Sequence, residues 1–200
     1  MQLEIWPPAS VLIALSLLAG CAADKPLHAG LVDNGHTLPP VSGVGLDQKF
    51  LKQTVTFGSD LKPGTIVVDT REKFLYLVQG GGQAIRYGIA VGDEAHAWTG
   101  RAKVTAKRPW PTWTPTADMI RRNPRLASYT TGMKPSVMNP LGARALYLAG
   151  ADGDRGYRIH GTPEWTSIGR AKSSGCIRLV NQDVIDLYDR VEVGAEVIVR

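Results

Sequence analysis

The chain has 200 residues, of which 44% are hydrophobic, and it carries a formal net charge of +5 at pH 7. This length suits one globular domain preceded by a processed leader, and it is sufficient to bury a sizeable core. Lysine and arginine are scattered, without the clusters and interleaved aromatic residues of a nucleic-acid-binding surface, which argues against that class of function. The 22 glycines and 13 prolines indicate many turns and favour a β-rich architecture over a helical bundle.

The first 20 residues have the pattern of a bacterial export signal. Residues 11–19 form an apolar run that is too short to span a bilayer as a helix. The run ends in Leu18-Ala19-Gly20-Cys21, which resembles the lipobox where a lipoprotein signal is cleaved and the new N-terminal cysteine is acylated. Because Ala22 rather than aspartate follows, we expect a periplasmic protein that is lipid-anchored through Cys21, at the outer membrane rather than the inner. An ordinary secretory signal with an incidental cysteine is the alternative.

Residues 21–62 show little sustained periodicity and contain scattered glycine and proline, so we predict a tether between the membrane and the domain. Within it, Phe50-Leu51 and residues 54–57 are expected to pack onto the domain as an edge segment. His28 and His36 fall in the tether and are interpreted as solvated loop residues. For an exported basic domain, carboxylate-rich cell-wall material is a more natural partner than nucleic acid.

The rest of the chain alternates short apolar runs with turn residues, as β-strands do. The segment 109–115 is rich in proline and cannot be a central strand; it could wall a groove, or its two tryptophans could simply bury apolar area. The long irregular connection 123–142 is interpreted as a flap over the site. Predicted strands cover residues 65–69, 73–79, 83–91, 101–107, 144–149, 157–160 and 195–199, and predicted helices cover residues 117–122 and 182–190, the second capped by Asn181.

His160 and Cys176 flank a loop that is rich in glycine, proline and serine. A thiol with a free pKa of about 8.5 is mostly protonated at pH 7, so a cysteine nucleophile needs a neighbouring base, which His160 could supply. The small residues Ser173-Ser174-Gly175 before the cysteine let the backbone turn and direct its N–H groups to one point, as in an oxyanion hole. A merely space-filling cysteine is disfavoured because of this polar turn and because Arg178 alternates with apolar neighbours.

No metal site or cofactor is expected. No histidine or second cysteine stands at zinc-ligand spacing, and His96, alone in a loop, is the weaker candidate for a catalytic base. If Cys21 is acylated, Cys176 is the single thiol of the mature chain. A lone thiol in an oxidising compartment favours a catalytic role.

Together these motifs resemble the signature of the L,D-transpeptidase catalytic domain of the YkuD type. The resemblance rests on His160-Gly161-Thr162, on Ile168-Gly169, and on the run 173–179, which reads Ser-Ser-Gly-Cys-Ile-Arg-Leu. Residues 139–142 and 145–148 and the hairpin around Gly80 are also similar to the family, so the resemblance covers about residues 64–200. Many members have histidine where this chain has Ser174, so this chain lacks a second imidazole at that position.

The resemblance implies a mostly β fold over residues 63–200, a β-sandwich with one or two short helices. It also implies a peptidoglycan transferase that serves cell-wall organisation and cell shape. In such an enzyme Cys176 attacks the carbonyl of the meso-diaminopimelate residue of a tetrapeptide stem, releases D-alanine, and passes the acyl group to an amine. His160 acts as the base.

The resemblance implies roles for further residues. The N–H groups of Gly175 and Cys176, with Ser174, hold the oxyanion, and Gly161 and Thr162 orient His160. Arg178 and Ser173 are expected to bind substrate. The acceptor is left open between another stem and the lysine of an envelope protein. The alternatives are transfer to water, which would make an L,D-carboxypeptidase, and a non-catalytic lipid-anchored peptidoglycan-binding protein.

Overall fold

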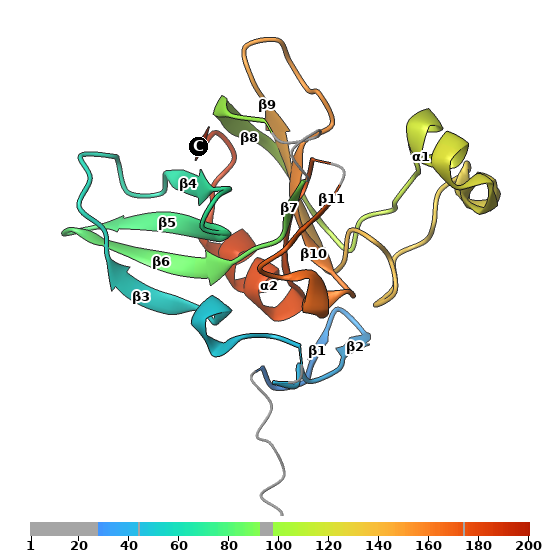
Figure 1. Cartoon of the computed structure of the whole chain (residues 1–200), viewed down its shortest axis with the longest axis horizontal. Coiled ribbons are helices and arrows are strands. Elements are labelled where there is room, and N and C mark those ends of the chain that lie inside the picture. The colour runs from blue at the N-terminus through green and yellow to red at the C-terminus, as the bar shows by residue number, and fades with distance from the viewer. Residues whose placement is uncertain (1–27, 44, 93–97, 174) are drawn as a thin grey trace, which may run out of the picture.

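The computed structural model describes residues 28–43, 45–92, 98–173 and 175–200, and Figure 1 shows how they are arranged. The main element in this part of the chain is a nine-stranded sheet, accompanied by short helices and two small two-stranded sheets. The predicted mostly β fold with short helices is confirmed. From one edge to the other, the large sheet contains β12 (Ile177–Val180), β10 (Arg158–Thr162), β9 (Arg144–Ala149), β8 (Gly100–Pro109), β13 (Glu196–Val199), β4 (Ile66–Asp69), β5 (Phe74–Gly80), β6 (Gln83–Gly88) and β3 (Gln53–Thr56).

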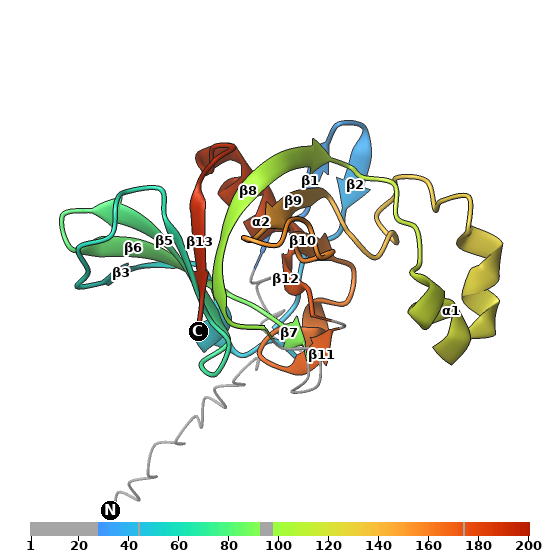
Figure 2. The same ribbon diagram turned by 90° about the horizontal axis from the view of Figure 1, so that it is seen from above.

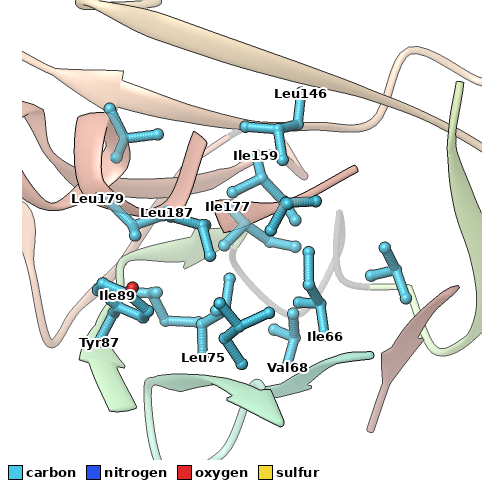
Figure 3. Packing of buried hydrophobic residues seen from close by; sticks show 14 of the residues in the cluster. Ile66, Val68, Leu75, Tyr87, Ile89, Leu146, Ile159, Ile177, Leu179 and Leu187 are labelled. Carbon is cyan, nitrogen blue, oxygen red and sulfur yellow. The ribbon is translucent and has the colours of Figure 1, made fainter. Parts of the chain in front are cut away.

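The sheet curls so that its two halves face each other across one hydrophobic core. Figure 2 shows β8 bending between them, and a register shift between Val104 and Ala106 marks a bulge in this strand. Bulges of this kind increase local bending and twist. In Figure 3, one group of buried side chains (Leu146, Ile159, Ile177, Leu179, Leu187) lies opposite a second group (Ile66, Val68, Leu75, Tyr87, Ile89). Removing both apolar faces from water is what stabilises a sandwich of this type.

The edge strand β12 is held on both of its sides near Arg178. It pairs in parallel with β10, where His160 is the partner of Arg178. On the other side, the Ala90 N–H donates to the Arg178 carbonyl at 2.9 Å and the Arg178 N–H donates to the Ala90 carbonyl at 2.8 Å. Beside this bridge, β7 (Val91–Gly92) pairs in parallel with β11 (Ala171–Ser173). The backbone around residue 178 is therefore fixed in place, two residues after Cys176.

The predicted strands are confirmed at bounds within about two residues, except that the run 83–91 is divided into β6 and β7. The predicted second helix is also confirmed as α2 (Asn181–Arg190), which packs on β9 and β10 and buries Val184 and Leu187 in the core. The predicted cap by Asn181 is wrong. Val180 is the N-cap residue, and Asn181 is the first helical residue, whose side chain makes the tertiary hydrogen bonds described below instead of a cap.

The predicted tether was residues 21–62, and the structure places much of the described parts 28–43 and 45–56 against the domain. A hairpin of β1 (Leu31–Asp33) and β2 (His36–Leu38) precedes the 3-10 helix η1 (Gln48–Phe50), and Leu38, Val41 and Leu46 are buried. The edge segment is confirmed, since β3 pairs with β6. The leader and Cys21 lie outside the described residues.

One polar contact and one ring-stacking contact contradict the interpretation of the two histidines in this segment as solvated loop residues. His28 lies 3.7 Å from the carboxylate of Asp183, and the ring of His36 stacks on Trp110 with 3.8 Å between centroids. In the same hairpin, the Asp33 carboxylate accepts from both terminal nitrogens of Arg144, at 2.7 and 2.9 Å.

A long excursion joins β8 to β9 and contains α1 (Ala117–Arg122) and the 3-10 helix η2 (Pro124–Tyr129), which project from the sheet in Figure 1. The predicted helix 117–122 is confirmed, and the Thr116 side chain caps it by accepting from the Met119 N–H. At the base of the excursion, the Trp110 N–H donates to the Ala143 carbonyl at 2.8 Å. A further 3-10 helix, η3 (Trp165–Ser167), follows β10. None of the helices in the described ranges combines the length and the apolar character that a membrane-spanning helix needs.

Candidate active site

Cys176 lies in the connection between β11 and β12, immediately before the first residue of β12. The preceding Gly175 has φ +103°, a backbone conformation that favours glycine and allows a tight turn. The turn brings Cys176 to a cavity of about 100 Å³ that is lined by Trp113, Met119, Pro140, Leu141, His160, Cys176 and Arg178. A thiol, an imidazole and a guanidinium group therefore border one small space.

The excursion between β8 and β9 supplies one wall of this cavity through Trp113 and Met119. Pro140 and Leu141, from the expected flap of residues 123–142, also line the cavity, so the flap reaches the candidate site. The two tryptophans of the proline-rich segment have different roles. Trp113 lines the cavity, as expected for the wall of a groove, whereas Trp110 is only 7% exposed at the base of the excursion and buries apolar area. The Trp110 Nε1–H donates to Asp33 at 2.7 Å, which links the base to the N-terminal hairpin.

His160 is delivered by β10 and is buried, with 4% of its surface exposed. Its Nδ1 lies 2.6 Å from the carbonyl oxygen of Gly161. Because a carbonyl only accepts, Nδ1 carries the proton and the lone pair of the neutral ring is on Nε2. Burial lowers the pKa of His160 to about 4, and the charges of Arg178 and Arg158 act in the same direction. The ring is therefore a neutral base at neutral pH.

The thiol of Cys176 points toward the β9–β10 connection, where its Sγ lies 3.8 Å from the carbonyl oxygen of Gly156. Burial raises the pKa of this thiol, and a backbone hydrogen bond from Arg158 and the charges of Arg158 and Arg178 oppose that rise. The thiol is therefore protonated at neutral pH, but groups that would stabilise a thiolate already surround it. Such a thiol becomes a nucleophile only when a base removes its proton.

Arg178 lies on the face of β12 that borders the cavity, while Ile177 and Leu179 point into the core, as the alternation predicted. Its Nη1 is 3.3 Å from a carboxylate oxygen of Glu164. The second cation near the thiol, Arg158, is held by a bidentate contact to Asp154 at 2.7 and 3.0 Å. Neither Glu164 nor Arg158 was singled out in the sequence, because only the tertiary structure brings them next to Arg178 and Cys176.

Asn181 connects the elements that carry the site, although the sequence suggested only a helix cap. Its side-chain oxygen accepts from the Ala143 N–H at 2.9 Å, and its amide nitrogen donates to the Thr162 carbonyl at 3.2 Å. A side chain at position 161 would collide with the side-chain oxygen of Asn181, so the close approach requires glycine there. The end of the excursion, the end of β10 and the start of α2 are thereby fixed to one another.

Asn139 has a comparable part inside the excursion. Its amide nitrogen donates to the carbonyl groups of Pro111, Met133 and Lys134, at 3.1 to 3.2 Å, and its side-chain oxygen accepts from the Leu141 N–H at 2.9 Å. Because Leu141 lines the cavity, these bonds hold one wall of it.

The remaining predicted site residues lie as follows. Gly161 and Thr162 are buried in β10, and the Thr162 hydroxyl accepts from the Glu164 N–H at 3.0 Å, so the contact to the imidazole comes from Gly161. Ser173 is the last residue of β11, but its side chain is outside the described part, as are Ser174 and His96. Among the described residues, no group of three or more histidine, cysteine, aspartate or glutamate side chains could hold a metal ion.

Two of the curated proteins to which this chain is similar are both named probable L,D-transpeptidases. The probable L,D-transpeptidase YbiS of Escherichia coli K12 is 31% identical over 166 residues, which is 80% of this chain and 51% of that protein. The probable L,D-transpeptidase ErfK/SrfK of Salmonella typhimurium is 37% identical over 137 residues, or 66% of this chain and 42% of that protein. The chain thus spans about half the length of the curated relatives it matches.

Among solved structures, one from Brucella melitensis is described as a probable carnitine operon oxidoreductase. It is 49% identical to this chain with a TM-score of 0.54, and the match covers 78% of this chain and 96% of that one. An L,D-transpeptidase from Mycobacterium smegmatis shares the fold at 22% identity, with a TM-score of 0.51 over 68% of this chain and 58% of that one. A model of the L,D-transpeptidase catalytic domain family matches residues 63–199. The chain therefore belongs to the L,D-transpeptidase catalytic domain family.

Proposed function

We propose that the protein is a peptidoglycan L,D-transpeptidase that works through a thioester on Cys176. The observation that carries the proposal is the cavity shared by the Cys176 thiol and the neutral imidazole of His160. Family membership and the names of the curated relatives support the reaction class. The oxidoreductase description of the Brucella melitensis protein does not enter the proposal, because neither the family nor the curated relatives carry that activity in their names.

In the first half of the reaction, Nε2 of His160 takes the thiol proton and Sγ of Cys176 attacks the carbonyl carbon of meso-diaminopimelate in a tetrapeptide stem. The oxyanion that forms is held by the N–H groups of Gly175 and Cys176, with Ser174 as a third donor. The C–N bond to D-alanine then breaks, and the imidazolium returns its proton to the leaving amine. The products are a thioester and free D-alanine.

In the second half, an amine of another stem or of an envelope protein lysine attacks the thioester carbonyl, and His160 removes a proton from this amine. The C–S bond breaks and the thiol is regenerated with that proton. Arg178 binds a carboxylate of the stem, since a guanidinium can pair with it in two-point geometry. Transfer to water would instead make the protein an L,D-carboxypeptidase, and the products of the experiment below distinguish the two.

The test is to incubate purified sacculi with the protein and analyse the released and cross-linked peptides by mass spectrometry. We expect D-alanine release and new amide-linked products with wild-type protein, and neither with Cys176→Ala. Intact mass after treatment with a carbapenem provides a second readout, because only an activated thiol should gain the adduct. Binding of the wild-type protein to sacculi without any product or adduct would favour a non-catalytic peptidoglycan-binding protein.

The site of action follows from the leader, and we propose a periplasmic protein anchored by lipid at Cys21. The support is the sequence Leu18-Ala19-Gly20-Cys21 and the substrate, which lies outside the inner membrane. The scattered positive charge of the chain suits a carboxylate-rich wall.

A further inference from the structure

A second cavity continues from the one at the thiol. It has a volume of about 230 Å³ and is lined by Met138, Pro140, Thr162, Pro163, Glu164 and Arg178. Pro140 and Arg178 line both cavities, so the guanidinium lies where the two meet. A ligand whose reacting carbonyl lies at Cys176 can therefore extend past Arg178 toward Glu164.

The contact between Arg178 and Glu164 is weak enough for a ligand to replace Glu164 as the partner of Arg178. It is a single Nη1 contact of 3.3 Å, and the Glu164 side chain is 69% exposed. Exposed ion pairs of this kind contribute little to stability. Arg178 is more buried, with 22% of its side chain exposed, and its Nε finds no hydrogen-bond partner among the described residues. A ligand carboxylate could offer this guanidinium a better, two-point partner than Glu164 does.

We propose that Glu164 and Arg178 together recognise the free α-amino acid centre at the end of the donor's diaminopimelate side chain. Arg178 binds the carboxylate of this centre, and Glu164, displaced from Arg178, binds its ammonium group. This inference rests on the proposed function. It adds which part of the donor the enzyme recognises when it selects among donors. Each charge of the resting pair exchanges one partner for another of the same sign, so no charge is left uncompensated.

The geometry agrees with the length of such a side chain. The backbone positions of Cys176 and Arg178 are two residues apart along the chain, a separation of roughly 6.5 to 7 Å where the backbone is extended. A short methylene chain spans that order of distance between the reacting carbonyl and the terminal amino acid centre. The walls contributed by Met138 and Pro140 are apolar, as the methylenes require, and the charged pair lies at the far end.

A charged pair selects more strictly than either member alone. An arginine alone would accept any carboxylate, and a glutamate alone would accept any amine, including the side chain of a lysine-type stem. Both charges are satisfied only by a ligand that carries the two groups on one carbon. Blocking either group leaves a charge of the pair without its partner, which is the usual source of discrimination by polar sites.

The experiment measures single-turnover release of D-alanine with enzyme in excess, so that an amine on the donor cannot complicate the readout as an acceptor. Three tetrapeptide donors are compared, with the diaminopimelate side-chain centre free, amidated at its carboxylate, or acetylated at its amine. Wild-type protein should prefer the free donor over each blocked donor by roughly tenfold, the effect of one lost charge-assisted hydrogen bond at a half-exposed site.

Glu164→Gln should remove the preference over the amine-acetylated donor, bringing that ratio to about one, and should retain the preference over the amidated donor. The matched control is Glu192→Gln, an exposed carboxylate that lines neither cavity, and it should keep both ratios. The backbone hydrogen bonds of Glu164 to Thr162 and Ser167 are unaffected by the change, so the variant should fold.

An unchanged preference over the acetylated donor in Glu164→Gln would overturn this inference while leaving the thioester mechanism in place. A uniform loss of rate for all three donors would equally overturn it, since that result indicates a general structural role for Glu164. No D-alanine release from any donor by wild-type protein would overturn the proposed function and this inference together.

Discussion

The imidazole of His160 transfers the proton in the proposed reaction, so its removal should lower the reaction rate strongly. In His160→Gln we expect the acylation rate to fall by roughly 100-fold or more, the usual scale for loss of a general base. The rate of adduct formation with a carbapenem, followed by intact mass, measures this. His28→Gln is a suitable control, because that ring lies beside Asp183 and does not line the cavity. A larger effect from His96→Gln would show that the base has been misassigned.

The protonation state of the same residue predicts the acid limb of the pH profile. Burial lowers the pKa of His160 to about 4, below its ordinary value of 6.5, so the neutral form persists as the pH falls through 6.5. The acylation rate should therefore stay near its neutral value at pH 5 and decline only as the pH approaches 4. The unfolded chain binds this proton more readily, so the contribution of the neutral ring to stability is also lost between pH 6.5 and 4.

Thermal unfolding measured at each pH separates these two effects, because a rate that falls while the protein is still folded reports the imidazole itself. An acid limb centred near pH 6.5 would contradict the buried neutral base.

Among the residues of the candidate site, those that lie in contiguous motifs could be predicted from the sequence alone. Cys176, His160 and Arg178 could be named because their neighbours determine their direction, through the glycine turn and the alternation of β12. Glu164, Gly156 and Asn181 could not be assigned their contacts in this way. Each acts through a partner in another element, such as the carbonyl of Thr162 or the N–H of Ala143 for Asn181, and no local pattern specifies such a partner.

At the level of elements, strands and helices with a clear apolar period were predictable, whereas the N-terminal hairpin was not. Residues 28–46 have no sustained periodicity, and their fold depends on contacts with distant residues, such as the pairing of Asp33 with Arg144, 111 positions away. The hairpin also holds Trp110, at the base of the excursion that walls the cavity. Within the segment expected to be a tether, the hairpin of β1 and β2 thus supports the candidate site.

The contribution of the Asp33–Arg144 contact to the free energy of unfolding can be measured with the variant Asp33→Ala. The side chains of Asp33 and Arg144 are only 17% and 7% exposed, and the Arg144 guanidinium beside Asp33 holds the pKa of that carboxyl below its usual range. Removing the carboxylate leaves a buried guanidinium without its bidentate partner. We expect a loss of about 3 kcal/mol in the free energy of unfolding, the low end for breaking a buried pair, since Asp33 is not fully covered.

Denaturant unfolding of Asp33→Ala and of Asp152→Ala provides the comparison. Asp152 pairs with Arg155 at 3.6 Å, but both side chains are about two-thirds exposed or more, at 74% and 67%. This second change should therefore cost less than about 1 kcal/mol. Equal costs for the two variants would show that the hairpin contact does not hold the N-terminal segment in place.

For the molecule as a whole, the core and the site depend on the same curled sheet. The two sheet halves meet at the bridge between Ala90 and Arg178, and this bridge fixes the strand that follows Cys176. The curvature itself was not predictable, because it arises from the bulge in β8 and from contacts between strands far apart in the sequence. The strand content and its order along the chain were predictable from turns and apolar runs.

The last expectation concerns where the whole molecule resides. If Cys21 is acylated, the protein should fractionate with membranes, because several acyl chains anchor a protein stably where a single chain binds only marginally. Cys21→Ser should then appear in the soluble periplasmic fraction with its catalytic domain still folded. Cys176→Ser is the matched control, since it removes the other cysteine of the chain and should remain with the membranes. The mass of the N-terminal peptide of the mature protein decides the matter directly. An unmodified Cys21, or a Cys21→Ser variant that still sediments with membranes, would rule out the lipid anchor and leave an ordinary secretory leader as the explanation of the apolar run.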